Sequence, residues 1–266
     1  MKVNIIYPKD KWILQKIGEE LNKRLDYSVL SDRKSPNINS CDINFYITYN
    51  LFEIKSQSID VGLFTHIEEK SKRLVNNFFN KANKIDFCVT MAKKYENILN
   101  TKNILNTKTI NMGIDLDLFK PKLILGFVGH SNNKIRKGAE LLKKIKKINF
   151  VELRATEGAL SEEEIPNFYR QLDYVLITSK YEGGPMCVVE GLACGIPIIA
   201  PDVGQVPDFD TGIFRYENSN FESLVSLLST LYQNKTKLRE QVEHLSWNFC
   251  AEQHDKLFKK LIQNKK

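Results

Sequence analysis

The sequence predicts an α/β protein with two domains, each built around a parallel sheet. Short apolar runs typical of buried strands alternate with segments of helical periodicity along the whole chain. The 266 residues have room for two domains of about 120 to 150 residues each. No internal repeat or low-complexity linker interrupts this order. We therefore expect domains at residues 1–120 and 121–245, with a final helical segment at 246–266.

The first domain is expected to open on a strand and to continue as alternating helices and strands. Its helices are predicted from apolar residues at three- and four-residue spacing, as in the stripe of Ile13, Ile17, Leu21 and Leu25. The expected strands are residues 3–7, 42–48, 60–65 and 86–90, and the expected helices are residues 9–25, 68–84 and 92–99.

The second domain repeats the pattern and ends in helices. The expected strands are residues 123–129, 149–153, 173–177 and 196–200. The expected helices begin after Gly138, at Phe221 and at Thr236. The last of these is long and charged, and its apolar residues, Trp247, Phe249, Leu257 and Leu261, are candidates for packing rather than for the site.

The stretch from Thr178 to Gly204 organises the second domain. A helix must connect the strands on either side of it, and its apolar face is predicted from Met186, Val189, Leu192 and Ala193 at helical spacing. Gly195 fits the position just past a helix end, and Pro197 prevents continuation. The unit is therefore a strand, a glycine-rich turn, a helix and a strand.

Two glutamates frame this unit, Glu182 in the turn and Glu190 inside the helix. Eight helical steps advance about 12 Å and return to within roughly 80° of the starting face, so both carboxylates could line one elongated ligand. Between them, Gly183 and Gly184 allow a ligand close to the backbone at a helix N-terminus. There, free N–H groups and the helix dipole favour an anion such as a diphosphate. The sequence thus predicts a phosphate site flanked by two acceptors for sugar hydroxyls.

A basic pair, Arg136 and Lys137, stands between an expected strand and the next helix. In a parallel sheet this connection lies at the carboxyl end of the strand, where ligands bind. Arginine offers a planar fork and lysine a point charge, so the pair could hold a diphosphate. The alternative is a basic helix start on a basic protein.

The pattern Glu182-x7-Glu190, followed by residues 191–200 (GLACGIPIIA), resembles the signature of retaining GT-B glycosyltransferases, in particular glycosyltransferase family 4. The resemblance implies a GT-B fold, in which two Rossmann-like domains have parallel sheets that face a cleft. Residues 1–120 would form the acceptor-side domain and residues 121–245 the nucleotide-sugar-binding domain, with a C-terminal helix at 246–266 crossing back to the first domain. It covers nearly all of the second domain and only the outline of the first.

The resemblance also implies roles for the site residues. Glu182 would contact the donor sugar and Glu190 the ribose diol, with Gly183, Gly184, Pro185 and Met186 completing the donor-binding turn. Arg136 and Lys137 match the family's basic residues that neutralise the donor diphosphate. Family members often place a histidine at the end of a first-domain strand, where it meets the transferred sugar. His66 matches that position, and its alternative is a local contact with Glu68 or Glu69. The expected catalytic residues are therefore Glu182, His66, Lys137 and Arg136.

We expect the protein to use neither a metal nor another cofactor. Asp115-Leu116-Asp117 spells the D-x-D pattern that binds metal in the other large glycosyltransferase fold. Three letters occur often by chance, and the Gly113-Ile114-Asp115 context is similar to the family's interdomain segment.

We therefore expect a hexosyltransferase that moves a hexose-type sugar from a nucleotide-diphosphate donor to a glycan or lipid-linked acceptor, with retention and without a metal. Two alternatives remain open. The first domain lacks the family's glycine turn after its first strand, so the chain could be a donor-binding scaffold that partners an active transferase. It could also be a sugar-nucleotide epimerase on the same architecture.

Composition limits the partners. The net charge of +7 suits anionic partners, among them nucleotide phosphates and an acidic lipid surface, although the lysines are spread along the chain. No nucleic-acid signature accompanies them, so no nucleic-acid partner is expected. Five scattered cysteines favour reduced thiols, no apolar run reaches 18 residues, and no signal peptide is recognised. The expected location is cytoplasmic, with possible peripheral association at the inner membrane face.

Overall fold

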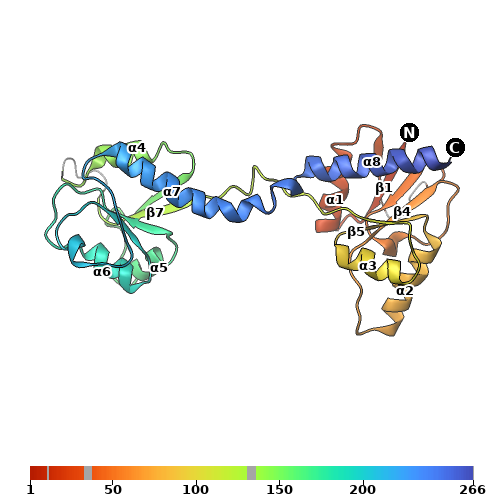
Figure 1. Ribbon diagram of the computed structural model, residues 1–266, viewed down its shortest axis with the longest axis horizontal. Coiled ribbons are helices and arrows are strands. Elements are labelled where there is room, and N and C mark those ends of the chain that lie inside the picture. The colour runs from red at the N-terminus through yellow and green to blue at the C-terminus, as the bar shows by residue number, and fades with distance from the viewer. Residues whose placement is uncertain (11, 33–37, 131–135, 266) are drawn as a thin grey trace. The chain divides into compact units, whose positions relative to one another are not determined.

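The computed structural model describes residues 1–10, 12–32, 38–130 and 136–265. The chain forms two compact units, each of which is described by itself (Figure 1). Unit 1 comprises Met1–Phe119 and Val242–Lys266, and unit 2 comprises Lys120–Gln241. The last part of the chain therefore returns to the unit in which the chain begins.

Unit 1 is built on a six-stranded parallel sheet with the strand order β2-β1-β3-β4-β5-β6. Parallel strands need crossover connections, and helices supply them between β1 and β2, between β4 and β5, and between β5 and β6. The strands are β1 (Val3–Tyr7), β2 (Ser28–Asp32), β3 (Ile43–Tyr46), β4 (Ile59–Phe64), β5 (Phe87–Thr90) and β6 (Thr107–Thr109).

Helices cover both faces of this sheet (Figure 1). One face packs against α1 and α8, whose buried residues Ile17, Leu21 and Phe258 join the strand residues in one core cluster. The other face packs against α2 and α3 through Phe78 and Leu99. The helices are α1 (Ile13–Asn22), α2 (Lys72–Lys84), α3 (Lys93–Thr101) and α8 (Trp247–Lys265), with short 3-10 turns η1 (Tyr49–Leu51) and η3 (Glu243–Leu245).

Unit 2 is built on a five-stranded parallel sheet with the order β11-β10-β9-β7-β8. The order reverses between β7 and β9, which are neighbours in the sheet although β8 lies between them in the chain. The strands are β7 (Leu123–Phe127), β8 (Val151–Ala155), β9 (Tyr174–Leu176), β10 (Ile198–Ala200) and β11 (Ile213–Arg215).

The helices of unit 2 also form two layers. One core cluster joins α4 and α7 to one face of the sheet, and another joins α5 and α6 to the opposite face. The helices are α4 (Ala139–Ile145), α5 (Ile165–Tyr169), α6 (Met186–Ala193) and α7 (Phe221–Glu240), with the 3-10 turn η2 (Val206–Asp208). The expectation of two α/β domains with parallel sheets is thus confirmed.

Several expectations about single elements were wrong. The helix expected from Thr236 onward is interrupted, because α7 continues to Glu240 and α8 starts at Trp247. Within α8, Phe249 is 42% exposed and does not pack in the core. On α6 the buried residues are Val188 and Gly191, whereas Met186 is 63% exposed, so the apolar face was placed one residue off. The strands β2 and β11 were not anticipated, because they are edge strands in which no residue is fully buried.

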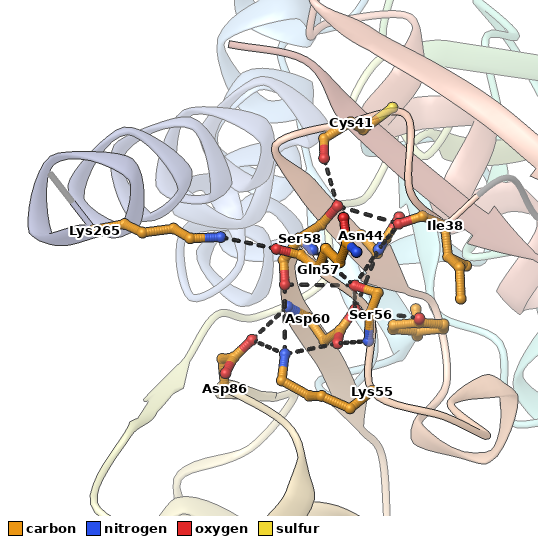
Figure 2. Close-up of polar contacts among 11 residues, drawn as sticks. Ile38, Cys41, Asn44, Lys55, Ser56, Gln57, Ser58, Asp60, Asp86 and Lys265 are labelled. Atoms are coloured by element: carbon orange, nitrogen blue, oxygen red, sulfur yellow. Dashed lines mark hydrogen bonds and ion pairs between the residues drawn. The ribbon is translucent and has the colours of Figure 1, made fainter.

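A polar cluster fixes the amino ends of the central strands in unit 1 (Figure 2). The side chain of Asp60, near the start of β4, is completely buried and forms an ion pair of 2.8 Å with Lys55. Ser56 and Asn44 donate further hydrogen bonds to the same carboxylate. Burial alone would raise the pKa of Asp60, but the hydrogen bonds from Lys55, Ser56 and Asn44 lower it below its ordinary value. This cluster lies at the end of the sheet opposite to the carboxyl edge.

None of the helices in the described ranges is long and apolar enough to cross a bilayer.

Candidate functional site

The expected donor residues of unit 2 meet at the carboxyl ends of β7 and β9. These are the strands between which the sheet order reverses, and ligands of open α/β sheets bind in the crevice outside such a point. Arg136 and Lys137 belong to the connection from β7 to α4, and Glu182 belongs to the connection from β9 to α6. Arg136 and Glu182, which are 46 positions apart in the sequence, are thus neighbours at the end of the sheet where ligands of such folds bind.

The two connections are joined through their backbones. The N–H of Lys180 donates to the carbonyl of Arg136 at 2.7 Å, and the hydroxyl of Thr178 donates to the carbonyl of Lys137 at 2.6 Å. Gly138 makes this approach possible, because its φ is +68° and a Cβ atom there would lie 2.1 Å from the carbonyl oxygen of Thr178. A larger residue at position 138 would separate the connections that carry the cations and the carboxylate.

Glu182 holds both cations. Its Oε2 atom is 2.8 Å from Nη1 of Arg136, and its Oε1 atom accepts a hydrogen bond from Nζ of Lys137. The side chain of Glu182 is 9% exposed, compared with 53% for Arg136. Burial alone would raise the pKa of Glu182, but the hydrogen bonds from Lys137 and Ser179 and the two positive charges lower it. The carboxylate is therefore ionised at neutral pH, and it orients the two cations.

The glycine turn that follows leaves open space next to the backbone. A Cβ atom built on Gly183 would meet no described atom within 4 Å. The turn is supported from below by Gly204, whose φ is +54° and where a Cβ atom would lie 2.2 Å from the carbonyl oxygen of Gly183. The amide of Gln205 also donates to the carbonyl of Pro185 at 3.2 Å. Support on one side and free space on the other suit the close approach of a ligand.

Helix α6 begins directly after this turn. Pro185 stands at its N-cap, and no side chain among the described residues caps the helix there. Met186, the first helical residue, is exposed. An uncapped N-terminus next to Arg136 and Lys137 adds N–H donors and a partial positive charge to the site.

Glu190 lies further along α6 and is half-buried. Its Oε2 atom accepts a hydrogen bond of 2.6 Å from the hydroxyl of Tyr169, at the end of α5. Sequence reasoning missed Tyr169. An aromatic residue in a short apolar helix is typical of core packing, and the contact with Glu190 becomes visible only in three dimensions.

The remaining catalytic candidate, His66, lies in unit 1. It follows β4 at the carboxyl edge of that sheet, and its side chain is 63% exposed. Its Nδ1 atom is 3.0 Å from the hydroxyl of Thr65, and its Nε2 atom is 3.9 Å from a carboxylate oxygen of Glu68. The local contact with Glu68, considered as the alternative to a catalytic role, is thus present but long. Trp12, which follows β1 at the same edge, is 75% exposed.

The D-x-D triplet has a local structural role. The Oδ1 atom of Asp115 accepts hydrogen bonds from the backbone N–H groups of Asp117 and Leu118, at 3.0 and 2.9 Å. Over the described ranges, no group of three or more histidine, cysteine, aspartate or glutamate side chains has the arrangement of a metal site.

A cation pair, an ionised carboxylate and an open glycine turn at a switch point are typical of α/β proteins that bind a phosphorylated ligand. The family described as glycosyl transferases group 1 matches residues 89–244, which is more than half of the chain. The chain belongs to this family. The matched region contains Arg136, Lys137, Glu182 and Glu190, whereas His66 lies outside it.

Two relatives that are similar in sequence carry glycosyltransferase names. The amylovoran biosynthesis glycosyltransferase AmsD of Erwinia amylovora is 28% identical over 171 residues, which cover 60% of this chain and 45% of that protein. The MMP alpha-(1->4)-mannosyltransferase of Mycolicibacterium hassiacum is 27% identical over 132 residues, covering 45% of this chain and 32% of that protein. The chain therefore spans less than half the length of these two relatives. Among solved structures, HepE of Anabaena in complex with UDP is 13% identical, with a TM-score of 0.45, coverage of 98% of this chain and 100% of that chain.

Proposed function

We propose that this chain transfers a hexose-type sugar from a nucleotide-diphosphate donor to a glycan or lipid-linked acceptor, with retention of configuration and without a metal. Membership of the glycosyl transferases group 1 family supports the transfer reaction. The word mannosyltransferase in the name of the Mycolicibacterium relative supports a hexose donor. The resemblance of Glu182-x7-Glu190 to the signature of retaining enzymes supports retention.

The observation that carries the proposal is the pairing of Arg136 and Lys137 with Glu182 at the switch point of unit 2. When a nucleoside diphosphate leaves, negative charge develops on its phosphate oxygens. Fixed cations and N–H donors stabilise such charge, and the loss of one donor typically lowers the rate about 100- to 1000-fold. In the proposed reaction Arg136, Lys137 and the N-terminus of α6 supply this stabilisation, so no metal is required.

Donor binding in this site is an exchange of partners. In the ligand-free chain both cations are neutralised by one carboxylate. A bound diphosphate takes over the cations, and Glu182 is then free to accept hydrogen bonds from the hydroxyl groups of the donor sugar. Glu190 accepts from the ribose. The departing phosphate takes the proton of the acceptor hydroxyl as that hydroxyl attacks the anomeric carbon from the same side.

The exposed His66 and Trp12 follow strands at the carboxyl edge of unit 1, where the resembled fold binds its acceptor. We propose that this edge receives the acceptor, and that a peripheral membrane contact serves a lipid-linked acceptor. Acidic lipid vesicles would test that contact directly, because a basic protein surface binds them in a salt-dependent manner.

The test is nucleoside diphosphate release from UDP-, GDP-, dTDP- and ADP-sugars with a chelator present. Wild type should release the diphosphate of one donor, and Glu182→Gln should lower this release at least about 100-fold. The same variant should bind the free nucleoside diphosphate no more weakly than wild type. A diphosphate without a sugar makes no contact with the carboxylate of Glu182, and without that carboxylate both cations are available to the phosphates. Glu140→Gln, at an exposed position that pairs with Lys143, is the matched control and should behave as wild type.

Each other outcome has a definite meaning. Diphosphate binding without release from any donor, even with a panel of glycan and lipid-linked acceptors, would favour the donor-binding scaffold. Full activity of Glu182→Gln would exclude the catalytic role of this carboxylate. Weaker diphosphate binding in Glu182→Gln would contradict the exchange of partners.

A further inference from the structure

Tyr169 is placed to hold Glu190 in one orientation. Its side chain is completely buried, and its hydroxyl donates a hydrogen bond of 2.6 Å to Oε2 of Glu190. The two residues lie on α5 and α6, which pack on the same face of the unit 2 sheet. The bond therefore links two separate elements, and the glutamate is one of the two that frame the donor site.

The position of the hydroxyl is determined by packing. The ring of Tyr169 belongs to the core cluster that also contains Val175, Val188 and Ile198, and it meets Phe168 edge to face at a centroid distance of 6.1 Å. A ring enclosed in this way has few rotamers available. Its oxygen is consequently a fixed point toward which the more mobile glutamate side chain is drawn.

The direction of this hydrogen bond is also fixed. Burial, followed by the hydrogen bond to Glu190, raises the pKa of Tyr169 far above its ordinary value. The phenol is therefore protonated at neutral pH, so it donates the hydrogen bond and Glu190 accepts it. Phenol donors to carboxylates are among the stronger hydrogen bonds of proteins.

The contact leaves half of the carboxylate available. Oε2 is taken by Tyr169, and Oε1 has no hydrogen-bond partner among the residues that the structure describes. Since Glu190 is half-buried, this open oxygen remains accessible to a ligand. A glutamate with one oxygen held by a hydrogen bond presents the other oxygen in a single direction. Such a fixed acceptor can select a ligand that has a hydroxyl group at one particular position.

We propose that Tyr169 is a positioning residue that orients Glu190 toward the ribose of the donor nucleotide and thereby sets the preference for ribonucleotides over 2′-deoxyribonucleotides. The inference rests on the proposed function, in which Glu190 meets the ribose diol. Tyr169 itself touches no substrate. Its contribution is to hold Glu190 in one rotamer before the nucleotide binds, so that binding does not carry the entropy cost of ordering this side chain.

The expected effect follows from this division of roles. A site that offers a hydrogen bond to a hydroxyl group discriminates against the analogue that lacks it. We expect wild type to prefer the ribonucleotide about tenfold or more, the equivalent of one charge-assisted hydrogen bond. In Tyr169→Phe the affinity for the ribonucleotide should fall about five- to tenfold, with much less change for the deoxynucleotide, so that the preference falls to about twofold.

The experiment measures dissociation constants by calorimetry for three nucleotide pairs: UDP and dUDP, GDP and dGDP, ADP and dADP. The pair that wild type binds is then measured with Tyr169→Phe, Glu190→Ala and the double variant. If Tyr169 acts through Glu190, Tyr169→Phe should have no further effect on the preference once Glu190 is alanine.

Tyr216→Phe is the matched control. Tyr216 is a buried tyrosine of the same unit, and its hydroxyl donates to the backbone carbonyl of Ile177 at 2.9 Å rather than to a glutamate. Its loss should lower stability as the loss of Tyr169 does while leaving the ribose preference unchanged. A reduced preference in both tyrosine variants would mean that general loosening of the fold, and not Glu190, is responsible.

Two further results would overturn the inference in distinguishable ways. If wild type binds a diphosphate and Tyr169→Phe, still folded by circular dichroism, keeps the full ribose preference, the positioning role is wrong and the proposed function stands. If wild type binds no member of any pair and releases no diphosphate from the dTDP-sugar either, the proposed function fails and the inference fails with it. Release from the dTDP-sugar alone would leave the proposed function standing and would contradict the ribose preference.

Discussion

Protonation of His254 should destabilise unit 1 in mildly acidic solution. This histidine lies on α8 and is completely buried, against the ring of Phe45 at a centroid distance of 5.2 Å. Its Nδ1 atom is 2.8 Å from the carbonyl oxygen of Cys250, and its Nε2 atom has no partner among the described residues. Burial lowers the pKa of His254 to about 4, partly opposed by the bond to Cys250 and assisted by the charge of Lys108.

The size of the effect follows from the two pKa values. The unfolded chain takes up the proton below pH 6.5, whereas the folded chain resists protonation down to about pH 4. Stability contributed by the neutral His254 is therefore present above pH 6.5 and is lost as the pH falls through this window. Between pH 7 and pH 5 the free energy of unfolding should fall by about 2 kcal/mol, and the limit at lower pH is about 3 kcal/mol.

Tryptophan fluorescence reports this loss for unit 1 alone. The chain has two tryptophans, Trp12 and Trp247, and both belong to unit 1. Trp247 is 3% exposed at the start of α8, so its emission should change when the helix that carries His254 separates from the sheet. Urea unfolding at pH 7, 6 and 5 gives the free energy at each pH even though the chain contains a second cooperative unit.

The comparison with His254→Gln isolates the titrating group. Between pH 7 and pH 5 the free energy of unfolding should fall by about 2 kcal/mol less in the variant than in wild type, whatever the stability of the variant at pH 7. His244→Gln, at an exposed position of the same unit, controls for the loss of a histidine elsewhere. Equal pH dependence in wild type and His254→Gln would refute the reasoning, because it would assign the acid sensitivity to other groups.

Two further predictions concern single positions. In unit 2, Gly138→Ala should lower the free energy of unfolding by about 1 to 3 kcal/mol and weaken diphosphate binding, because its φ is positive and the new Cβ meets a carbonyl oxygen. Gly195→Ala, where φ is also positive but no described atom lies within 4 Å, should cost less when both are compared by circular dichroism during heating. In unit 1, Lys55→Met should cost about 1 to 3 kcal/mol by tryptophan fluorescence, because the buried carboxylate of Asp60 loses its cation. Lys9→Met, which removes an exposed pair of 3.8 Å, should cost less than about 1 kcal/mol, and equal costs for the two lysines would contradict this account.

Hydrophobic periodicity was sufficient to predict most of the fold. The central strands are apolar runs buried on both faces, and such runs are hard to mistake when charged helices separate them. The edge strands β2, β6 and β11 gave no such signal. Residues 107–109 of β6 are Thr-Lys-Thr and none of them is fully buried, so nothing in the local sequence distinguishes this strand from a loop. Its pairing with β5 is decided by the backbone of the neighbouring strand.

The face of α6 was placed wrongly for a related reason. Gly191 is buried because its missing side chain makes room for Val175 and Ile198, and a Cβ atom there would lie 2.9 and 2.8 Å from them. A glycine carries no hydrophobic signal, so the pattern was completed with Met186 instead. The helix packs closely on the sheet because residue 191 has no side chain. Hydrophobic periodicity cannot detect a packing position of this kind.

The candidate site was predictable to the extent that its residues stand in one motif. Glu182, Gly183 and Glu190 are linked by fixed spacing, and Arg136 and Lys137 were found because they follow a strand. The structure adds that the cations and Glu182 contact one another directly. Spacing could not reveal this, since it depends on two strands that are neighbours in space only because the sheet order reverses.

Each glutamate of the site is held in place by hydrogen bonds from neighbouring side chains. Glu182 is held by two cations that a diphosphate would take over, whereas Glu190 is held by a neutral phenol that no anion would displace. The first arrangement is reversible and charge-dependent, so its energy should vary with ionic strength and with bound phosphate. The second is partly buried and has an uncharged donor, so its energy should depend much less on ionic strength and on phosphate. In the proposed function, a donor that arrives with its phosphates first would therefore find the carboxylate of Glu190 already oriented for the ribose. Its binding would free the carboxylate of Glu182 to accept hydrogen bonds from the donor sugar.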